Sequence, residues 1–340
     1  MYITDDGGAS GPIPGRIRDA PCGTTAAADT LHTMPGKTPL PVMPARQLQP
    51  SVPLVALDYL WFQVAGTVCN LRCAHCFISC APDNHNFWFL DLETVRNYLE
   101  QSKAWGVKEY YFTGGEPFMN RDLLPMLEEA LFLGPASVLT NGTLLPEKTV
   151  RRLAEIDASS RFSLELRVSI DGPTAESNDA IRGTGCFDRA MEGIQRLVAH
   201  GLMPILTAAQ LWDPAQDLEV LDQFTDALRK VGYDRPRIKI LPTLRLGREA
   251  ARTRGYSDGE LVTRAMMEGY EVTQLLCSTG RVVSDRGVHV CPILLEEPDA
   301  LLGATLEEAD RPHTLSSRAC YTCWLHGAIC TNYGGIGQEL

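Results

Sequence analysis

The sequence of 340 residues lacks several features that define large classes of proteins. It contains no run of about 18 or more apolar residues, so it predicts no membrane-spanning helix. Residues 1–20 include Asp5 and Asp6 and no apolar stretch, which argues against a secretory signal peptide. The formal net charge is −11 and no basic stripe is present, which argues against nucleic-acid binding. These absences predict a cytoplasmic protein that binds neither a membrane nor a nucleic acid.

Two further absences limit the interpretation. Residues 1–50 are rich in Pro, Gly, Ala and Thr and show no periodic apolar pattern, so they predict a disordered leader. No G-x-G-x-x-G sequence follows the first predicted strand, which disfavours a plain NAD oxidoreductase.

From about residue 58, β-strands are predicted to alternate with helices. The predicted strands are 60–67, 107–113, 136–140, 164–170, 203–208 and 237–241. The predicted helices are 91–105 (capped by Asp91), 120–132 (capped by Asn120), 148–156, 187–200, 218–231 and 258–274. This α/β alternation implies parallel strands joined by right-handed crossovers, which form either a barrel or a doubly wound sheet. In both architectures ligands bind at the carboxyl ends of the strands.

The cysteines are clustered. The chain has 11, with three in residues 69–76 and five in residues 277–330, whereas the helix and strand pattern stops beyond residue 275. In a reducing compartment such clusters indicate metal binding and not disulfides.

The first cluster is Cys69-x3-Cys73-x2-Cys76, in the loop after the first predicted strand. Three thiolates can bind three irons of a [4Fe–4S] cluster and leave the fourth iron open to a ligand. A structural zinc site is the alternative. Cys80 follows four residues later, and we predict a packed thiol there because a fourth protein ligand would block the open position.

This spacing, with His75 just before the third cysteine, resembles the signature loop of the radical S-adenosylmethionine (SAM) superfamily. Further motifs follow later strands in the expected order. They are Gly114-Gly115-Glu116-Pro117, Thr140-Asn141-Gly142, and Ser169 and Asp171 followed by Arg182. Leu241 lies where the family forms the wall beside adenine. The resemblance implies a partial (β/α)6 TIM-like barrel of the radical SAM type over residues 55–270.

The resemblance also implies a mechanism. Cys69, Cys73 and Cys76 would bind the cluster, and SAM would chelate the open iron. The glycines and Glu116 would receive the amino group of SAM. An electron from a donor such as flavodoxin or ferredoxin would cleave SAM to a 5′-deoxyadenosyl radical, which abstracts hydrogen from the substrate.

The second cluster resembles the auxiliary-cluster module of SPASM/Twitch enzymes and would cover residues 275–335. Its five cysteines suffice for one auxiliary [4Fe–4S] cluster, and two complete clusters would need about eight. We favour the first four as ligands, and the role of the fifth is open. A zinc ribbon is the alternative. The five are Cys277, Cys291, Cys320, Cys323 and Cys330.

The substrate is less defined by the sequence. We predict hydrogen abstraction from a peptide or small metabolite, in peptide or natural-product maturation, with the auxiliary cluster aiding oxidation. A porphyrin- or molybdopterin-like cofactor pathway and a non-catalytic iron–sulfur or zinc protein are the alternatives. No catalytic side chain is assigned, although Cys186 is either a hydrogen-atom donor or a packed thiol. Arg245 and Arg248 either contact an anionic substrate or are solvated.

Overall fold

The computed structural model describes residues 49–331. The predicted leader at residues 1–50 lies outside this range except for its last two residues, and so do residues 332–335 of the predicted C-terminal module. No helix in the described range is both long and apolar enough to cross a membrane.

Six parallel strands form the centre of the molecule. They are β2 (Tyr59–Gln63), β3 (Glu109–Thr113), β4 (Ala136–Thr140), β5 (Leu164–Ser169), β6 (Ile205–Ala209) and β7 (Arg237–Leu241). Each pairs in parallel with the next strand along the chain. A doubly wound sheet requires a reversal of strand order within its parallel strands, and β2 to β7 follow one another in chain order without one. The unbroken order therefore selects the barrel-type alternative, and β7 and β10 are the unpaired edges of the described sheet, which leaves the barrel partial.

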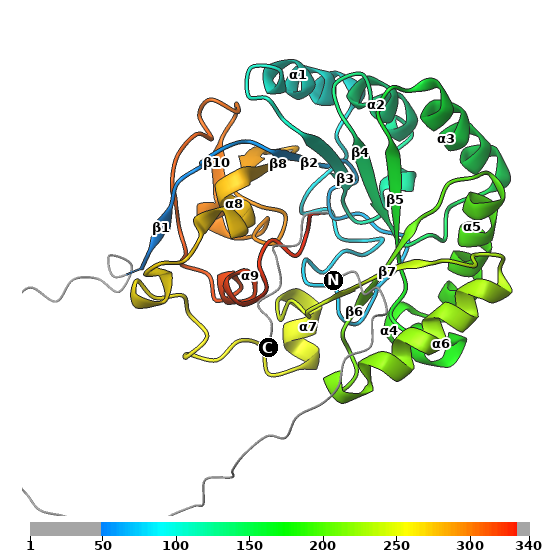
Figure 1. Ribbon diagram of the computed structural model, residues 1–340. Helices are drawn as coiled ribbons and strands as arrows, with labels where there is room; N and C mark the ends of the chain where they lie inside the picture. The colour runs from blue at the N-terminus through cyan, green and yellow to red at the C-terminus, as the bar shows by residue number, and fades with distance from the viewer. Residues whose placement is uncertain (1–48, 332–340) are drawn as a thin grey trace, which may run out of the picture.

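Helices cover the outside of the curved sheet (Figure 1). They are α1 (Leu92–Ser102), α2 (Leu123–Ala130), α3 (Glu147–Ser159), α5 (Cys186–Ala199) and α6 (Asp217–Lys230). Alternate strand residues face these helices, and Phe62 and Phe112 stack there with ring centroids 5.4 Å apart. The other face lies inside the barrel, where Trp61 stacks on Tyr111 at 4.1 Å. Both faces are therefore packed, as is typical of parallel sheets.

The predicted helix starts are partly correct. Asp91 is the N-cap of α1, and its carboxylate accepts from the Thr94 amide at 2.7 Å. The prediction that Asn120 caps α2 is wrong, because α2 begins at Leu123. The Asn120 amide group instead donates to the carbonyls of Val64 and Leu90 at 2.8 Å each. Asn120 therefore anchors the loop after β2 and not the helix.

Two helix predictions need correction. No helix spans residues 258–274, where only the short 3-10 turns Ala265–Met267 and Val272–Gln274 form. The backbone of Gly269 has φ of +72°, which interrupts a helix. Conversely, the helix α4 (Ala175–Arg182) was not predicted. It begins with a capping box between Thr174 and Ser177.

The C-terminal residues extend the barrel sheet. Strand β8 (Gly280–Ser284) pairs in parallel with β2, and β9 (Gly287–His289) and β10 (Leu301–Gly303) follow as antiparallel strands. The expectation that regular structure ends at residue 275 is therefore wrong. The remaining elements are β1 (Ser51–Val52), paired with β11 (His313–Thr314), and α7 (Gly247–Arg252), α8 (Leu276–Thr279) and α9 (Cys320–His326).

Candidate functional site

The cysteine loop, residues 69–80, follows β2 at the carboxyl edge of the sheet. Its side chains form a small cluster that is separate from the main core. The buried members are Cys69, Leu71, Cys73, Ile78, Cys80 and Cys186, and Cys76 and Phe77 pack against them. The loop is closed at its base by a bridge between Val68 and Ala81. The three predicted cluster ligands are thus brought together on one loop.

The thiols of the loop differ in their surroundings. Burial raises the pKa of Cys69 to about 12 and that of Cys73 to about 11. A hydrogen bond from Cys80 lowers the pKa of the Cys76 thiol, and the Cys80 amide also donates to Cys76 Sγ at 3.2 Å. Cys80 is buried, as expected for a packed thiol.

The glycine turn after β3 lies directly against this loop. The Glu116 amide donates to the Val68 carbonyl at 3.1 Å. A Cβ atom at Gly115 would lie 2.0 Å from that carbonyl oxygen, and Gly114 has φ of +147°. Only glycine permits this approach, so the turn and the loop form one unit. Pro117 then begins the 3-10 turn Pro117–Met119.

The Glu116 carboxylate is fully buried and joins two turns. It accepts from the Thr140 hydroxyl at 2.7 Å, from the Asn141 amide at 2.8 Å and from the Phe118 amide at 3.1 Å. Burial raises its pKa to about 7, although these donors favour the charged form. In this structure the carboxylate fixes the turns after β3 and β4. Its contact with the amino group of SAM stays a prediction.

Asn141 connects the turn after β4 to the cysteine loop. Its side-chain amide donates to Asn70 Oδ1 at 2.8 Å and approaches Cys69 Sγ at 3.8 Å. Asn70 in turn donates to the Thr143 hydroxyl at 2.9 Å. Asn70 and Thr143 were not predicted, because their importance comes from a contact between residues 73 positions apart.

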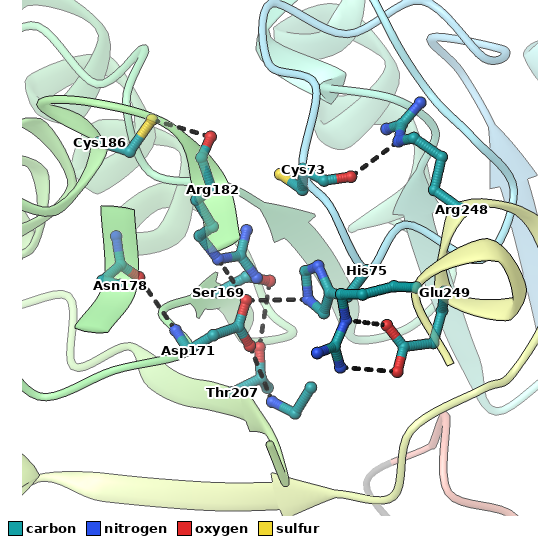
Figure 2. A network of polar contacts seen from close by, with 12 residues as sticks. Cys73, His75, Ser169, Asp171, Asn178, Arg182, Cys186, Thr207, Arg248 and Glu249 are labelled. Carbon is teal, nitrogen blue, oxygen red and sulfur yellow. Dashed lines mark hydrogen bonds and ion pairs between the residues drawn. The ribbon is translucent and has the colours of Figure 1, made fainter. Parts of the chain in front are cut away.

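Asp171 contacts two other predicted site residues, His75 and Arg182 (Figure 2). Its Oδ2 lies 2.9 Å from His75 Nε2 and 2.6 Å from Arg182 Nε. Its Oδ1 accepts from the Ala209 amide at 2.9 Å. Burial alone would raise the pKa of Asp171, but Arg182 and His75 hold it well below its usual range. The Ala74 amide donates to the carbonyl of Ile181 in α4 at 2.7 Å, which joins the cysteine loop to the helix that carries Arg182.

The remaining predicted cofactor residues lie at strand ends. The Ser169 hydroxyl is 3.3 Å from the Thr207 hydroxyl (Figure 2). Leu241 ends β7, and its carbonyl accepts from the Gln210 amide at 2.8 Å. His75 Nδ1 is buried and has no hydrogen-bond partner among residues 49–331. That nitrogen can therefore accept from or donate to a bound molecule.

Three side chains for which the sequence left two roles open each contact other groups of the protein. The Cys186 thiol is buried and donates to the Arg182 carbonyl at 3.3 Å, which favours packing over hydrogen-atom donation. Arg245 pairs with Glu260 and lies over the Tyr256 ring at 4.4 Å. Arg248 donates to three backbone carbonyls of the cysteine loop.

A pocket in the C-terminal region contains four of the five later cysteines. Its lining is otherwise almost entirely apolar, and the four cysteines come from three separate segments of the chain. The cysteines are Cys277, Cys291, Cys320 and Cys323. Burial raises the pKa of Cys277 to about 12. These are the four residues that the sequence analysis favoured as auxiliary-cluster ligands.

Cys330 does not line this pocket. It packs beside Trp61 and Tyr111 on the inner face of the barrel. Its carbonyl accepts from Arg167 Nη1 at 2.9 Å, and the Thr331 carbonyl accepts from Lys239. The charges of Cys291 and Cys323 nevertheless interact with that of Cys330, so the choice of four ligands among the five cysteines stays a prediction.

The chemistry of both thiol sets fits iron–sulfur clusters. A zinc ion draws its four ligands to about 2.3 Å, whereas each thiolate of a [4Fe–4S] cluster binds a different iron. The loop offers three thiols, enough for three irons of such a cluster, and the pocket offers four, enough for all four irons.

The fold and the loop define the class: an α/β partial barrel with a three-cysteine loop at the carboxyl ends of its strands. Residues 64–209 match the family model of the radical SAM superfamily. This part of the chain therefore forms a radical SAM domain.

Several characterised relatives share part of the sequence. Mycofactocin maturase MftC of Mycobacterium tuberculosis is 29% identical over 166 residues, which cover 48% of this chain and 40% of the relative. Fe-coproporphyrin III synthase of Methanosarcina barkeri is 30% identical over 183 residues, which cover 53% of this chain and 43% of the relative. A probable GTP 3′,8-cyclase of Saccharolobus islandicus is 30% identical over 141 residues, covering 41% and 43%. The matches thus span less than half the length of these relatives.

Solved structures share the fold. Streptococcus suis SuiB bound to its precursor peptide SuiA superposes with a TM-score of 0.55 at 16% identity, covering 72% of this chain and 62% of SuiB. Native anSMEcpe with bound AdoMet gives a TM-score of 0.54 at 15% identity, covering 74% and 79%. These similarities establish the architecture and not the substrate.

Proposed function

We propose that this protein is a radical SAM enzyme that abstracts hydrogen from a peptide or small-metabolite substrate. In the proposed assignment, residues 55–270 form the catalytic barrel and residues 275–335 hold an auxiliary cluster. When bound, the cluster and SAM supply a 5′-deoxyadenosyl radical. The protein supplies the binding, orientation and exclusion of water.

The observation that carries this proposal is the convergence of three turns on the cysteine loop. The turn after β3 contacts it through Gly115, the turn after β4 through Asn141, and the segment after β5 through Asp171. A structural metal loop needs no such surroundings. A site for a zwitterionic ligand does, because its ammonium and carboxylate groups need opposite partners.

We assign each side chain a role in this site. Cys69, Cys73 and Cys76 bind the cluster. The backbone of Gly114 and Gly115 offers carbonyl groups to the ammonium of SAM. A larger set surrounds the rest of SAM and comprises His75, Glu116, Pro117, Asn141, Ser169, Asp171, Arg182 and Leu241.

An auxiliary [4Fe–4S] cluster is proposed in the four-cysteine pocket. Four thiols fully ligate one such cluster, so its role is electron acceptance or relay and not direct substrate anchoring. The apolar lining limits water access, which influences the reduction potential of a cluster. A reductant such as flavodoxin or ferredoxin is proposed to supply the electron to the first cluster.

The substrate class is proposed as a peptide or a small metabolite in natural-product maturation. A maturase, mycofactocin maturase MftC, is among the relatives by sequence, and the SuiB structure contains a precursor peptide. Biosynthesis of a porphyrin-like or pterin-like cofactor is the second candidate, because a coproporphyrin synthase and a GTP cyclase are matched at similar identity.

The decisive test is anaerobic reconstitution with iron and sulfide, followed by SAM and dithionite. We expect about eight irons per chain, as two [4Fe–4S] clusters require, and formation of 5′-deoxyadenosine. Zinc in place of iron, with no SAM cleavage, would overturn the proposal in favour of a non-catalytic metal protein.

A substrate screen would then separate the two candidate pathways. Deuterium transfer from a labelled candidate into 5′-deoxyadenosine identifies the molecule that loses hydrogen. Peptides, coproporphyrin and GTP are tested in parallel with the same reconstituted protein. Label transfer from coproporphyrin or GTP alone would contradict the proposal of peptide maturation.

A further inference from the structure

We propose that Arg248 is a positioning residue for the cysteine loop. Its guanidinium group holds the loop backbone in the conformation that presents the thiols, and its charge tunes the potential of a cluster bound there. The second half of this inference rests on the proposed cluster at Cys69, Cys73 and Cys76.

The loop depends on side chains for its shape. Between Cys73 and Cys80 it contains no helix or strand, so its carbonyl groups have few backbone partners. Arg248 Nε donates to the Cys73 carbonyl at 2.8 Å, as Figure 2 shows. Nη1 donates to the Ser79 carbonyl at 2.8 Å and Nη2 to the Cys80 carbonyl at 2.6 Å. All three guanidinium nitrogens therefore hold the loop.

The backbone around Arg248 is fitted to the same loop. The Arg248 amide donates to the Cys76 carbonyl at 3.1 Å. The preceding residue, Gly247, has φ of +50°, and a Cβ atom there would lie 2.4 Å from the Phe77 carbonyl oxygen. Helix α7 thus docks on the loop through its first turn. Within the same helix, the buried carboxylate of Glu249 pairs with Arg252.

In the part of the chain that the structure describes, the guanidinium of Arg248 forms no ion pair with a carboxylate. The ion pairs found within residues 49–331 include the neighbouring Arg245 and Arg252 but not Arg248. Three neutral carbonyls leave its charge uncompensated, so it attracts negative charge on nearby sulfur atoms. A cluster on this loop gains a negative charge when it is reduced, and Arg248 stabilises that state.

This arrangement distinguishes arginine from lysine. A guanidinium is a rigid fork that can reach three carbonyls at once, whereas an ammonium is a compact point charge. Lysine at this position would keep the positive charge but could not donate to all three carbonyls at once. The two substitutions Arg248→Lys and Arg248→Gln therefore separate the geometric effect from the electrostatic effect.

The experiment compares Arg248→Lys, Arg248→Gln and a control, Arg254→Gln. Arg254 is exposed and six residues away, and its change removes the same charge. Hydrogen exchange of the amides in residues 73–80 is measured first in the metal-free protein. Both Arg248 variants should exchange about tenfold faster than the wild type, the factor expected for losing one charged hydrogen bond.

Reconstituted protein provides the second readout. Both Arg248 variants should bind the iron of this loop about tenfold or more weakly, a typical cost of losing an outer-shell partner. In a potentiometric titration by electron paramagnetic resonance, only Arg248→Gln should shift the midpoint potential to a more negative value. Circular dichroism checks that all variants remain folded.

Two results would overturn the inference. In one, Arg248→Gln matches Arg254→Gln in exchange, iron retention and potential. In the other, Arg248→Lys restores the wild-type exchange rate, which would show that charge alone holds the loop. A wild-type protein that binds no iron would refute the proposed function and the tuning role, but the metal-free exchange measurement would still decide the positioning role.

Discussion

The two cysteine regions use different construction. In the first, three thiols lie within eight consecutive residues, 69–76, and polar contacts from three neighbouring turns surround the loop. In the second, four thiols between residues 277 and 323 meet in an apolar pocket. In the first site one loop thus supplies all three thiols, and neighbouring turns hold that loop in place. The second exists only because separate elements come together.

Both regions nevertheless rely on an arginine that binds backbone carbonyls. Arg281 is fully buried in the second region and donates to the carbonyls of Cys277, Gly280, Ala309 and Arg311. Arg248 in the first region likewise donates to several backbone carbonyls. Loops that present thiols contain little regular structure, so a multivalent donor is an effective way to order them.

The largest expected effect breaks the first site completely. In a Cys69→Ala, Cys73→Ala, Cys76→Ala variant, iron should fall from about eight to about four per chain. Formation of 5′-deoxyadenosine should fall to background. Iron analysis and product chromatography after reconstitution check this. If all iron is lost, the two regions are not independent.

The second site is tested by single serine substitutions. Cys291→Ser should lower iron from about eight to about four per chain, while SAM cleavage by dithionite without substrate continues. Cys330→Ser is the matched control and should keep about eight, because Cys330 lies outside the pocket. Iron loss from Cys330→Ser equal to that from Cys291→Ser would reassign the ligand set.

The polar surroundings of the first site predict a stability effect. Glu116→Ala should lower the free energy of unfolding by about 2–5 kcal/mol, because it leaves a cavity and buried donors on Thr140 and Asn141 without an acceptor. Glu116→Gln preserves the volume and should cost less. Urea unfolding of the metal-free proteins measures both. Equal stability of the alanine variant and the wild type would show that the carboxylate does not join the turns.

The apolar surroundings of the second site predict acid sensitivity. Burial lowers the pKa of His313, which lines the cysteine pocket, to about 4. Its unfolded-state pKa is about 6.5, so the unfolded chain binds more protons between pH 6.5 and 4. The free energy of unfolding therefore receives its full contribution from neutral His313 above pH 6.5. It falls by about 1.4 kcal/mol per pH unit as the pH drops from 6.5 towards 4.

The control for this effect is His313→Gln, which does not titrate. Its free energy of unfolding should depend less steeply on pH over the same window than that of the wild type. Both metal-free proteins are unfolded in urea at several pH values, so that cluster loss does not contribute. Identical slopes would contradict the assignment to His313.

The smallest effect concerns residues 328–331, the segment that contains Cys330. Lys239→Met removes the donor to the Thr331 carbonyl, so amides of residues 328–331 should exchange a few-fold faster. Iron content should not change. Exchange mass spectrometry measures this. Unchanged protection would mean that Arg167 and packing against Trp61 suffice to hold the segment.

Much of the strand layout followed from local pattern. The strand 136–140 was predicted at its observed bounds, and the cap at Asp91 was recognised because a carboxylate there satisfies a free amide. The absent helix at 258–274 and the unpredicted α4 show the limit of such patterns. The first contains turn-forming glycines, and the second is a short polar helix stabilised by its capping box.

The sequence by itself determined the spacing of Cys69, Cys73 and Cys76 and the order of the strand-end motifs, because both are properties of consecutive residues. Three features could be found only in the folded chain: β8 joins the barrel sheet, four later cysteines line one apolar pocket, and Arg248 donates to the cysteine loop. Arg248 and Cys73 are 175 positions apart. Their contact depends on how the strands curve and where α7 docks, and no local pattern encodes a distance of that kind.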